Sequence, residues 1–203
     1  MSKIGIFGGT FDPPHLGHLN IAKHAYDKLA LDEFWFMPNG IPAYKMIQRG
    51  ISSKEDRLMM LEILVKDIPW CQISRIEVER EGYTFTSDTL TWLSEKQPEN
   101  DYYLIIGSDS YKDMHMWHDP GTIFKLSTIV VLLRGEDTKE SLGEYTKKYI
   151  SEYDADVSIL ENLKYDISST RIREAVQNGE NTEKWIPNEI RDYILDNKLY
   201  GIS

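Results

Sequence analysis

The sequence contains almost no cysteine and no long hydrophobic run. Cys71 is the single cysteine among 203 residues, so the chain can form neither an internal disulfide nor a cysteine-rich zinc site, and we expect a buried structural thiol. No apolar run reaches the roughly 18 residues that a membrane-spanning helix needs, and the amino-terminal residues show no cleavable signal pattern. These absences predict a cytoplasmic protein that does not interact with membranes.

Positive charge is also scarce. Lys and Arg together number 23 against 33 Asp and Glu, which gives a formal net charge of -10. Broad affinity for nucleic acid comes mostly from clustered Lys and Arg, so we expect no nucleic-acid partner. An anionic ligand would have to be bound by a local group of cations that acts against the overall field of the molecule. The positions of a few cationic side chains are therefore informative.

Two common phosphate-binding motifs are missing. The chain has no G-x-x-x-x-G-K-[ST] string, so it is not a P-loop protein of the usual kind. It also lacks G-x-G-x-x-G, because the glycines of "GIFGGTFD" have a different spacing. The interpretation of the chain as a dinucleotide-binding oxidoreductase therefore loses its main support.

Strand-like and helix-like segments alternate along the chain. Apolar runs with little polar alternation suit buried parallel strands, and the amphipathic segments between them suit helices. This order predicts an α/β fold: a doubly wound (Rossmann-like) parallel sheet flanked by helices, with a small C-terminal helical part, in a single domain of residues 1–203. Ser52 and Glu55 have capping-box spacing at the start of the second helix. The expected strands are 3–8, 33–38, 71–78, 101–107, 127–133 and 156–160, and the expected helices are 17–30, 52–67, 87–97, 138–151, 169–178 and 188–198.

The segment "KIGIFGGTFDPPHLGH" at residues 3–18 joins the first strand to the first helix. Backbone N–H groups and the helix dipole favour phosphate at such a junction. His15 and His18 are three residues apart and can share one face of the helix. Zinc would need a third ligand that the neighbouring sequence does not offer, so we expect no metal site. Imidazoles that donate hydrogen bonds to phosphate are our preferred interpretation, and a turn with one capping and one packed histidine is the alternative.

Two strings far apart in the chain resemble the signatures of one family. "GGTFDPPHLGH" and "ISSTRIR" at 167–173 are similar to the two motifs of the nucleotidyltransferases with a T/H-x-G-H sequence. Taken alone, the second string is as well explained by a serine that caps a helix. The resemblance implies that His15, His18 and Arg173 contact the triphosphate. It implies an ATP site that also includes Gly8, Gly9, Thr10, Phe11, Ile167, Ser168, Ser169 and Thr170.

The middle of the chain resembles those members of the family that transfer AMP from ATP to nicotinate mononucleotide. The strings "MPNGIPAYK" at 37–45, "IIGSDSYKDMHMW" at 105–117 and "LLRG" at 132–135 have the matching order and spacing. By this resemblance Gly107 and Asp109 bind the adenosine of ATP, and Lys45 contributes a charge near the triphosphate. The implied contacts to nicotinate mononucleotide come from Thr86, Trp117, His118 and Arg134.

Some of these assignments leave alternatives open. Asp109 could cap a helix, Trp117 could pack in the core, and Arg134 could be a solvated loop charge. Thr84 competes with Thr86 for the contact to the acceptor carboxylate. Tyr44 stands where the family usually has a histidine.

The resemblance implies a direct mechanism. The acceptor phosphate would attack the α-phosphorus of ATP, and His15, His18, Lys45 and Arg173 would stabilise the developing charge. Mg²⁺ would enter with ATP, because it commonly binds through phosphates and water rather than a protein cage. A transferase with another acceptor, such as nicotinamide mononucleotide or phosphopantetheine, and a nucleotide-binding regulatory module without turnover are the alternatives. Apolar helix faces in the C-terminal third could serve the core or a homo-oligomer.

Overall fold

The computed structural model describes residues 1–42, 51–160 and 167–202. Within these ranges, no helix is long and apolar enough to cross a membrane. Lys45 and Tyr44 lie outside the described residues, so their expected places beside the triphosphate stay predictions.

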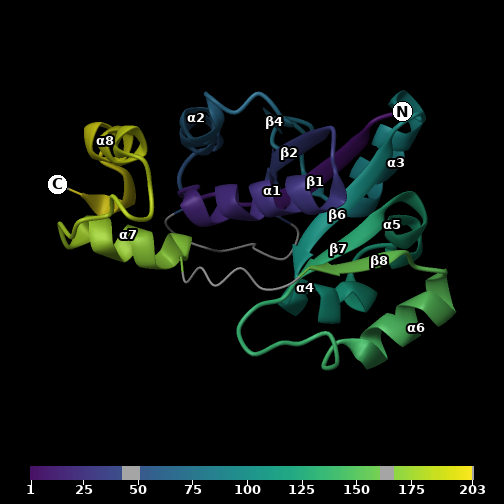
Figure 1. Ribbon diagram of the computed structural model, residues 1–203. Coiled ribbons are helices and arrows are strands. Elements are labelled where there is room, and N and C mark those ends of the chain that lie inside the picture. Colours follow the sequence, from purple (N-terminus) through teal and green to yellow (C-terminus); the bar gives the residue numbers. More distant parts are fainter. Residues whose placement is uncertain (43–50, 161–166, 203) are drawn as a thin grey trace.

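A six-stranded parallel sheet forms the centre of the molecule (Figure 1). The strand order is β4-β2-β1-β6-β7-β8, so the chain builds one half of the sheet outward from β1 and the other half outward from β6. This is the doubly wound arrangement that the sequence predicts. The strands are β1 (Lys3–Gly9), β2 (Glu33–Pro38), β4 (Cys71–Ile73), β6 (Asp101–Gly107), β7 (Thr128–Leu132) and β8 (Val157–Leu160), and β3 (Ile41–Pro42) pairs separately with β5 (Tyr83–Thr84).

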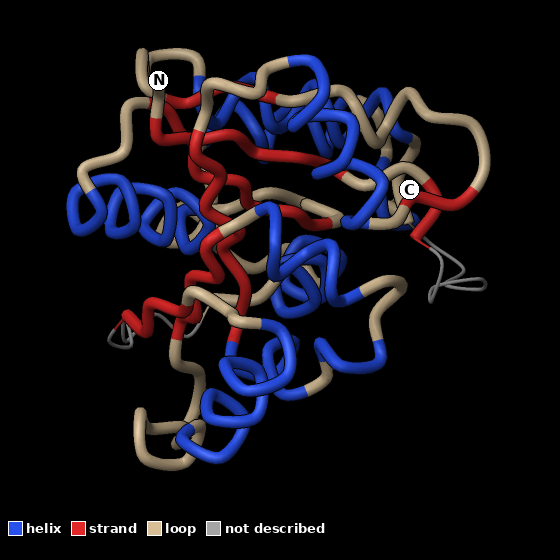
Figure 2. Tube along the Cα trace, turned by 90° about the vertical axis from the view of Figure 1, so that its right-hand side faces the viewer, coloured by secondary structure: helices blue, strands red, loops and turns tan. Residues whose placement is uncertain are grey.

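Helices cover both faces of the sheet (Figures 1 and 2). Two core clusters, one on each face, show which helices pack where. One face carries α1 (Leu16–Leu29), α2 (Lys54–Val65), α7 (Ser169–Gln177) and α8 (Asn188–Asp196), and Figure 1 shows the last two together at one end of the molecule. The other face carries α3 (Thr86–Lys96), α4 (Ser108–Lys112), α5 (Pro120–Leu126) and α6 (Gly143–Tyr153), together with the 3-10 turn η1 (Met114–Met116). The 3-10 turn η2 (Leu199–Gly201) packs on the first face.

Strand β6 shows why the apolar runs of the sequence are nearly continuous. Leu104 and Ile106 point into the cluster under α3 and α5, whereas Ile105 points into the cluster under α1 and α2. Side chains of a strand alternate between faces, and both faces are covered here. The strand is therefore apolar at every position of its centre.

Two expected elements are shorter in the structure. The predicted strand 71–78 ends at Ile73, because β4 is an edge strand that pairs with only three residues of β2. The predicted helix 138–151 begins at Gly143, because Thr138 and Ser141 exchange backbone-to-side-chain hydrogen bonds in a turn.

The capping box expected at Ser52 and Glu55 is wrong by one position. Ser53 caps α2 by accepting a hydrogen bond from the N–H of Asp56 at 3.0 Å. The N–H of Ser52 donates instead to the carboxylate of Asp12 at 3.2 Å. The same sequence spacing recurs one residue later, and this tertiary contact takes Ser52 out of the cap.

The neighbouring strands β1 and β6 mark the switch in strand order. Their carboxyl ends, Gly9 and Gly107, lie where the two halves of the sheet diverge, and open α/β sheets bind ligands at this place. A Cβ at Gly107 would collide with the carboxylate of Asp109 and would lie 2.7 Å from Nε of Arg134. Glycine therefore lets these two charged side chains converge over the end of β6.

Candidate active site

His15 and His18 form a reciprocal cap at the start of α1. The N–H of His18 donates to Nδ1 of His15 at 3.3 Å, and the N–H of His15 donates to Nδ1 of His18 at 3.2 Å. The two rings stack with centroids 3.6 Å apart at an interplanar angle of 18°. A neutral imidazole has one N–H, and Nδ1 accepts in both rings, so the proton lies on Nε2. Each ring therefore keeps an Nε2–H donor for a ligand.

Both histidines are uncharged at neutral pH. Burial and the positive charge of Arg134 lower the pKa of His15 to about 4. Burial, His15 and Arg134 lower the pKa of His18 well below its usual value of 6.5. The positive charge of Arg134 thus acts on both rings. The pair thus offers neutral donors beside a permanent cation, an arrangement that suits an anionic ligand.

Aromatic side chains hold the ring of His18. The ring of Phe11 meets it edge-on at 5.0 Å, and the ring of Phe7 lies at 5.9 Å. Phe11 is buried and has a φ of 52°. Its side chain packs below the histidine, so of the expected ATP-lining residues Phe11 faces the core, while Gly8, Gly9 and Thr10 keep some exposure.

The start of α7 docks onto the loop that carries the histidines. Nη1 of Arg173 donates to the carbonyl oxygen of Asp12 at 2.7 Å, and Oγ of Ser169 donates to the carbonyl oxygen of Pro13 at 2.9 Å. Arg173 also donates to the hydroxyl of Thr170 at 3.2 Å. The two family strings, distant in sequence, therefore meet at one place. The serine-cap interpretation also holds, because Ser168 accepts from the N–H of Arg171 at 3.2 Å.

Arg57 is a structural member of the site that sequence reasoning missed. It is 3% exposed and donates from Nη1 to the carbonyl oxygen of Thr10 and from Nη2 to that of Asn39, both at 2.9 Å. It thereby fixes the ends of β1 and β2. The sequence could have indicated its burial, because Arg57 stands at helical spacing from Leu61 and Leu64 on the apolar face of α2.

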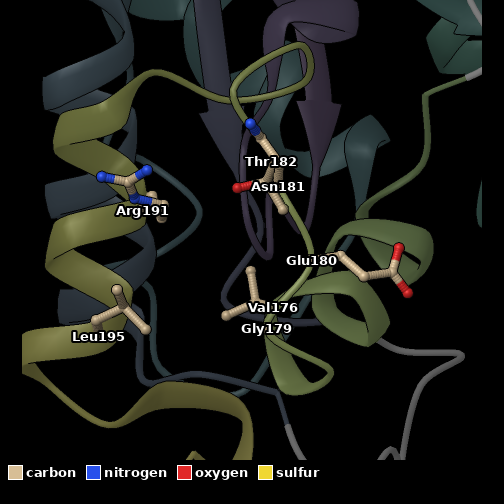
Figure 3. A pocket seen from close by; sticks show the side chains of 7 residues that line it. All are labelled: Val176, Gly179, Glu180, Asn181, Thr182, Arg191 and Leu195. Atoms are coloured by element: carbon tan, nitrogen blue, oxygen red, sulfur yellow. The ribbon is translucent and has the colours of Figure 1, made fainter.

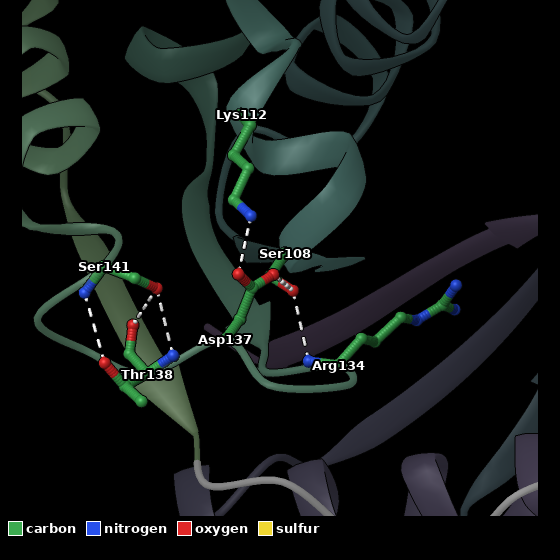
Figure 4. Close-up of polar contacts among 6 residues, drawn as sticks. All are labelled: Ser108, Lys112, Arg134, Asp137, Thr138 and Ser141. Carbon is green, nitrogen blue, oxygen red and sulfur yellow. Dashed lines mark hydrogen bonds and ion pairs between the residues drawn. The ribbon is translucent and has the colours of Figure 1, made fainter.

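A polar network holds Arg134 above the end of β6 (Figure 4). The N–H of Arg134 donates to Oγ of Ser108 at 3.1 Å, and Ser108 donates to Asp137 at 2.6 Å. Lys112 pairs with the same carboxylate at 2.6 Å, and the bonds from Lys112 and Ser108 lower the pKa of Asp137. Figure 4 shows the guanidinium of Arg134 pointing away from Asp137. It pairs with Asp109 at 3.4 Å, so Asp109 does not act as a helix cap.

The residues expected to bind the acceptor come from two neighbouring segments. Thr86 is the first residue of α3 and follows Phe85, whose ring lies 4.3 Å from the ring of His118. Trp117, next to His118, is half-buried and packs against the core under α3 and α5. The structure thus brings Thr86, Trp117 and His118 together, and it adds Phe85, which sequence reasoning did not single out.

The rest of the described structure offers no second site for a metal or a triphosphate. Within the described ranges, no group of three or more His, Cys, Asp or Glu could hold a metal ion. A cavity of about 330 Å³ lies between α7 and α8, away from the histidines (Figure 3). Its charged side chains already have partners: Arg191 pairs with Asp192 at 2.9 Å, and Glu180 pairs with Arg171 at 2.9 Å. This cavity does not match a triphosphate. It is lined by Val176, Gly179, Glu180, Asn181, Thr182, Arg191 and Leu195.

Comparisons with known proteins identify the family of this chain. Residues 6–175 match the model of the cytidylyltransferase-like family. A probable nicotinate-nucleotide adenylyltransferase of Geobacillus thermodenitrificans is 40% identical over 99% of this chain and 87% of its own length. One of Lachnoclostridium phytofermentans is 34% identical over 98% of this chain and 100% of its own length.

A solved structure shares the fold. Nicotinic acid mononucleotide adenylyltransferase of Plasmodium falciparum, complexed with NaAD, superposes with a TM-score of 0.80 at 20% identity, over 100% of this chain and 99% of the other. This likeness shows that the two proteins share the fold over their whole length. The chain therefore belongs to the cytidylyltransferase-like family of nucleotidyltransferases, and within it to the nicotinate-nucleotide adenylyltransferases.

Proposed function

We propose that the protein transfers AMP from ATP to nicotinate mononucleotide and releases pyrophosphate. The observation that carries this proposal is the meeting of His15, His18, Arg134 and Arg173 around the carboxyl ends of β1 and β6 in an otherwise acidic molecule. The names of the relatives support the choice of acceptor. The product would be the dinucleotide that still carries the nicotinate carboxylate.

ATP would lie across the strand switch. Gly8 and Gly9 at the end of β1, together with Gly107, would let the nucleotide approach the backbone, and Asp109 would accept hydrogen bonds from ribose hydroxyls. The start of α7, residues 167–170, would face the triphosphate together with Arg173. Lys45 would add a charge from a segment outside the described residues. These contacts follow the family resemblance, and the bonds of Ser169 and Arg173 to the loop that carries the histidines support them.

The chemistry needs no nucleophilic side chain, because the acceptor already carries an anionic oxygen. This oxygen forms a bond to the α-phosphorus of ATP, and the bond from the α-phosphorus to the bridging oxygen breaks as pyrophosphate leaves. The Nε2–H groups of His15 and His18 would donate to phosphate oxygens as charge develops, with Arg173 beside them. Because the rings are fixed before ATP arrives, little reorganisation is needed in the transition state.

ATP would enter as its magnesium complex. The donors around the site are imidazole and guanidinium groups, which suit the phosphates and not the cation. We therefore treat Mg²⁺ as part of the substrate, bound through phosphate oxygens and water.

Nicotinate mononucleotide would bind between α3 and η1. Trp117 would stack on the pyridine ring, and Thr86 with the backbone around His118 would hold the ring carboxylate. Arg134 would bind the phosphate of the acceptor, and the effect of its charge on both histidines supports this role. We further propose that residues 1–203 form one domain, since the helices of both chain halves pack on one sheet.

Pyrophosphate release with magnesium ATP and each of three acceptors tests the proposal. We expect the highest kcat/KM with nicotinate mononucleotide and lower values with nicotinamide mononucleotide and phosphopantetheine. A preference for either of the latter would identify a related transferase. ATP binding without pyrophosphate release for any acceptor would instead identify a nucleotide-binding module without turnover.

A further inference from the structure

Asp12 is a buried carboxylate in the histidine loop, and the proposed chemistry does not use it. It is 3% exposed. Its Oδ1 accepts a hydrogen bond from the hydroxyl of Tyr200 at 2.9 Å, and its Oδ2 accepts from the N–H of Ser52 at 3.2 Å. Its carbonyl oxygen accepts from Arg173 at 2.7 Å. Asp12 therefore joins the loop after β1 to three segments: the approach to α2, helix α7 and the turn η2.

Tyr200 is held firmly in the turn η2. It has a φ of 62°, in the left-handed region that a residue with a large side chain seldom adopts. Its carbonyl oxygen accepts a hydrogen bond from Nε2 of Gln177 in α7, and its hydroxyl lies 4.0 Å from Sδ of Met60 in α2. Burial and the nearby charge of Asp12 raise the pKa of Tyr200 far above its usual range. The hydroxyl is thus a permanent donor to Asp12.

We propose that Tyr200 is a positioning residue of the active site: through Asp12 it fixes the loop that carries His15 and His18 against Arg173. Asp12 lies three residues before His15, and its neighbour Phe11 packs edge-on against His18 at 5.0 Å. A shift of Asp12 would therefore displace both imidazoles and the partner of Arg173. Only the expected effect on kcat rests on the proposed function; the effect on the position of the loop does not.

The kinetic test compares two tyrosine variants. Tyr200→Phe keeps the ring and removes the donor, which leaves Oδ1 of buried Asp12 without this partner. We expect kcat to fall about tenfold or more, because a catalytic group misplaced by about 1 Å can lose on the order of a hundredfold. KM for ATP should change by less than about threefold, since the cations that bind the triphosphate remain.

Tyr193→Phe is the matched control. The hydroxyl of Tyr193 donates to Asp56 at 2.9 Å and joins α8 to α2, so the variant loses a tyrosine-to-carboxylate bond of the same length. Tyr200→Phe should lower Tm at least as much as Tyr193→Phe, because Asp12 is 3% exposed whereas Asp56 is only partly buried, and only Tyr200→Phe should lower kcat. Equal kcat for the two variants would overturn the proposal. If Tyr200→Phe does not fold, Gln177→Met loosens the same turn from the exposed face of α7 and should lower kcat in the same direction.

A measurement without substrate separates this inference from the proposed function. NMR titration of His15 in the ligand-free protein should give a pKa of about 4 in the parent chain. In Tyr200→Phe the pKa should move upward toward 6.5, because a loosened loop admits water to the ring, whereas Tyr193→Phe should leave it unchanged. An unchanged titration in Tyr200→Phe overturns the positioning role. Absence of pyrophosphate release by the parent chain contradicts only the proposed function.

Discussion

At the scale of single residues, the histidine pair has a simple physical design. Each ring caps the helix through Nδ1, and this bond fixes the tautomer that directs Nε2–H to the ligand. Burial keeps both rings neutral, so they bind phosphate as donors without a desolvated charge of their own. A cap and a phosphate ligand, which the sequence presented as alternatives, are therefore compatible roles of the same two side chains.

His18→Ala tests this design. We expect kcat to fall by about a hundredfold or more, because removal of one donor to developing charge typically costs that much. KM for ATP should change much less if the contact strengthens in the transition state. Initial rates of pyrophosphate release at saturating nicotinate mononucleotide measure the effect.

His24→Ala is the control on the same helix, six residues further along α1. It removes an imidazole without touching the cap of α1, so kcat should stay within about twofold, as for a substitution outside the group of reacting residues. Near-normal kcat in His18→Ala would exclude His18 from the mechanism and leave the cap as its role.

At the scale of elements, the network behind Arg134 links a strand end to a helix. Asp137 accepts hydrogen bonds from Ser108 and Lys112 of α4, and Ser108 in turn accepts from the N–H of Arg134. Asp137→Asn weakens this chain, because an amide offers one acceptor where the carboxylate offers two. We expect KM for nicotinate mononucleotide to rise about fivefold, with little change in KM for ATP, as expected when a group that positions the acceptor loosens.

Asp156→Asn is the matched control for this variant. Asp156 accepts from the hydroxyl of Thr128 at 2.7 Å, at the opposite end of β7 from Arg134. Its loss should leave both KM values unchanged. An unchanged KM for nicotinate mononucleotide in Asp137→Asn would show that the network does not serve acceptor binding.

The same elements show what sequence could and could not predict. The strands next to the switch, β1 and β6, were predicted within one residue because both faces are buried and their apolar runs are continuous. The helices α4 and α5 were missed, since they are short and are joined by a turn that bears Trp117 and His118. Asp12 and Tyr200 carried no local pattern, because their contact joins residues 188 positions apart. Long-range polar pairs of this kind depend on the assembled fold.

At the scale of the whole molecule, an acidic protein has a cationic site at the carboxyl ends of its central strands, β1 and β6. The formal charge of -10 opposes an approaching triphosphate, and the local arginines reverse this field only nearby. The neutral histidines add donors without adding charge. The neutrality of the histidines makes the stability of the fold depend on pH, because imidazoles kept neutral in the native state become protonated in the unfolded chain as pH falls.

The stability of the protein should therefore fall between about pH 6.5 and pH 4.5. The pKa of His15 is about 4 in the folded protein and 6.5 in the unfolded chain. Between these values the unfolded chain binds a proton that the native protein does not. The free energy of unfolding then decreases as pH falls, by at most about 1.4 kcal/mol per pH unit for each such proton. His18 adds to the slope with the same sign, because its pKa is lowered too.

Urea denaturation at a series of pH values measures this slope. Carboxylates with lowered pKa, such as Asp137 and Glu189, lose their stabilising effect as pH falls through their usual range near 4, and burial raises the pKa of Glu77, which opposes the decline. A variant that lacks only the His15 imidazole therefore isolates its share of the slope. His15→Asn provides the control, because asparagine is a good helix cap and does not titrate. The variant should show a shallower decline from pH 6.5 to pH 4.5 than the parent chain. An equal decline would mean that His15 is protonated in the native protein, and the description of the pair as neutral donors would then be wrong.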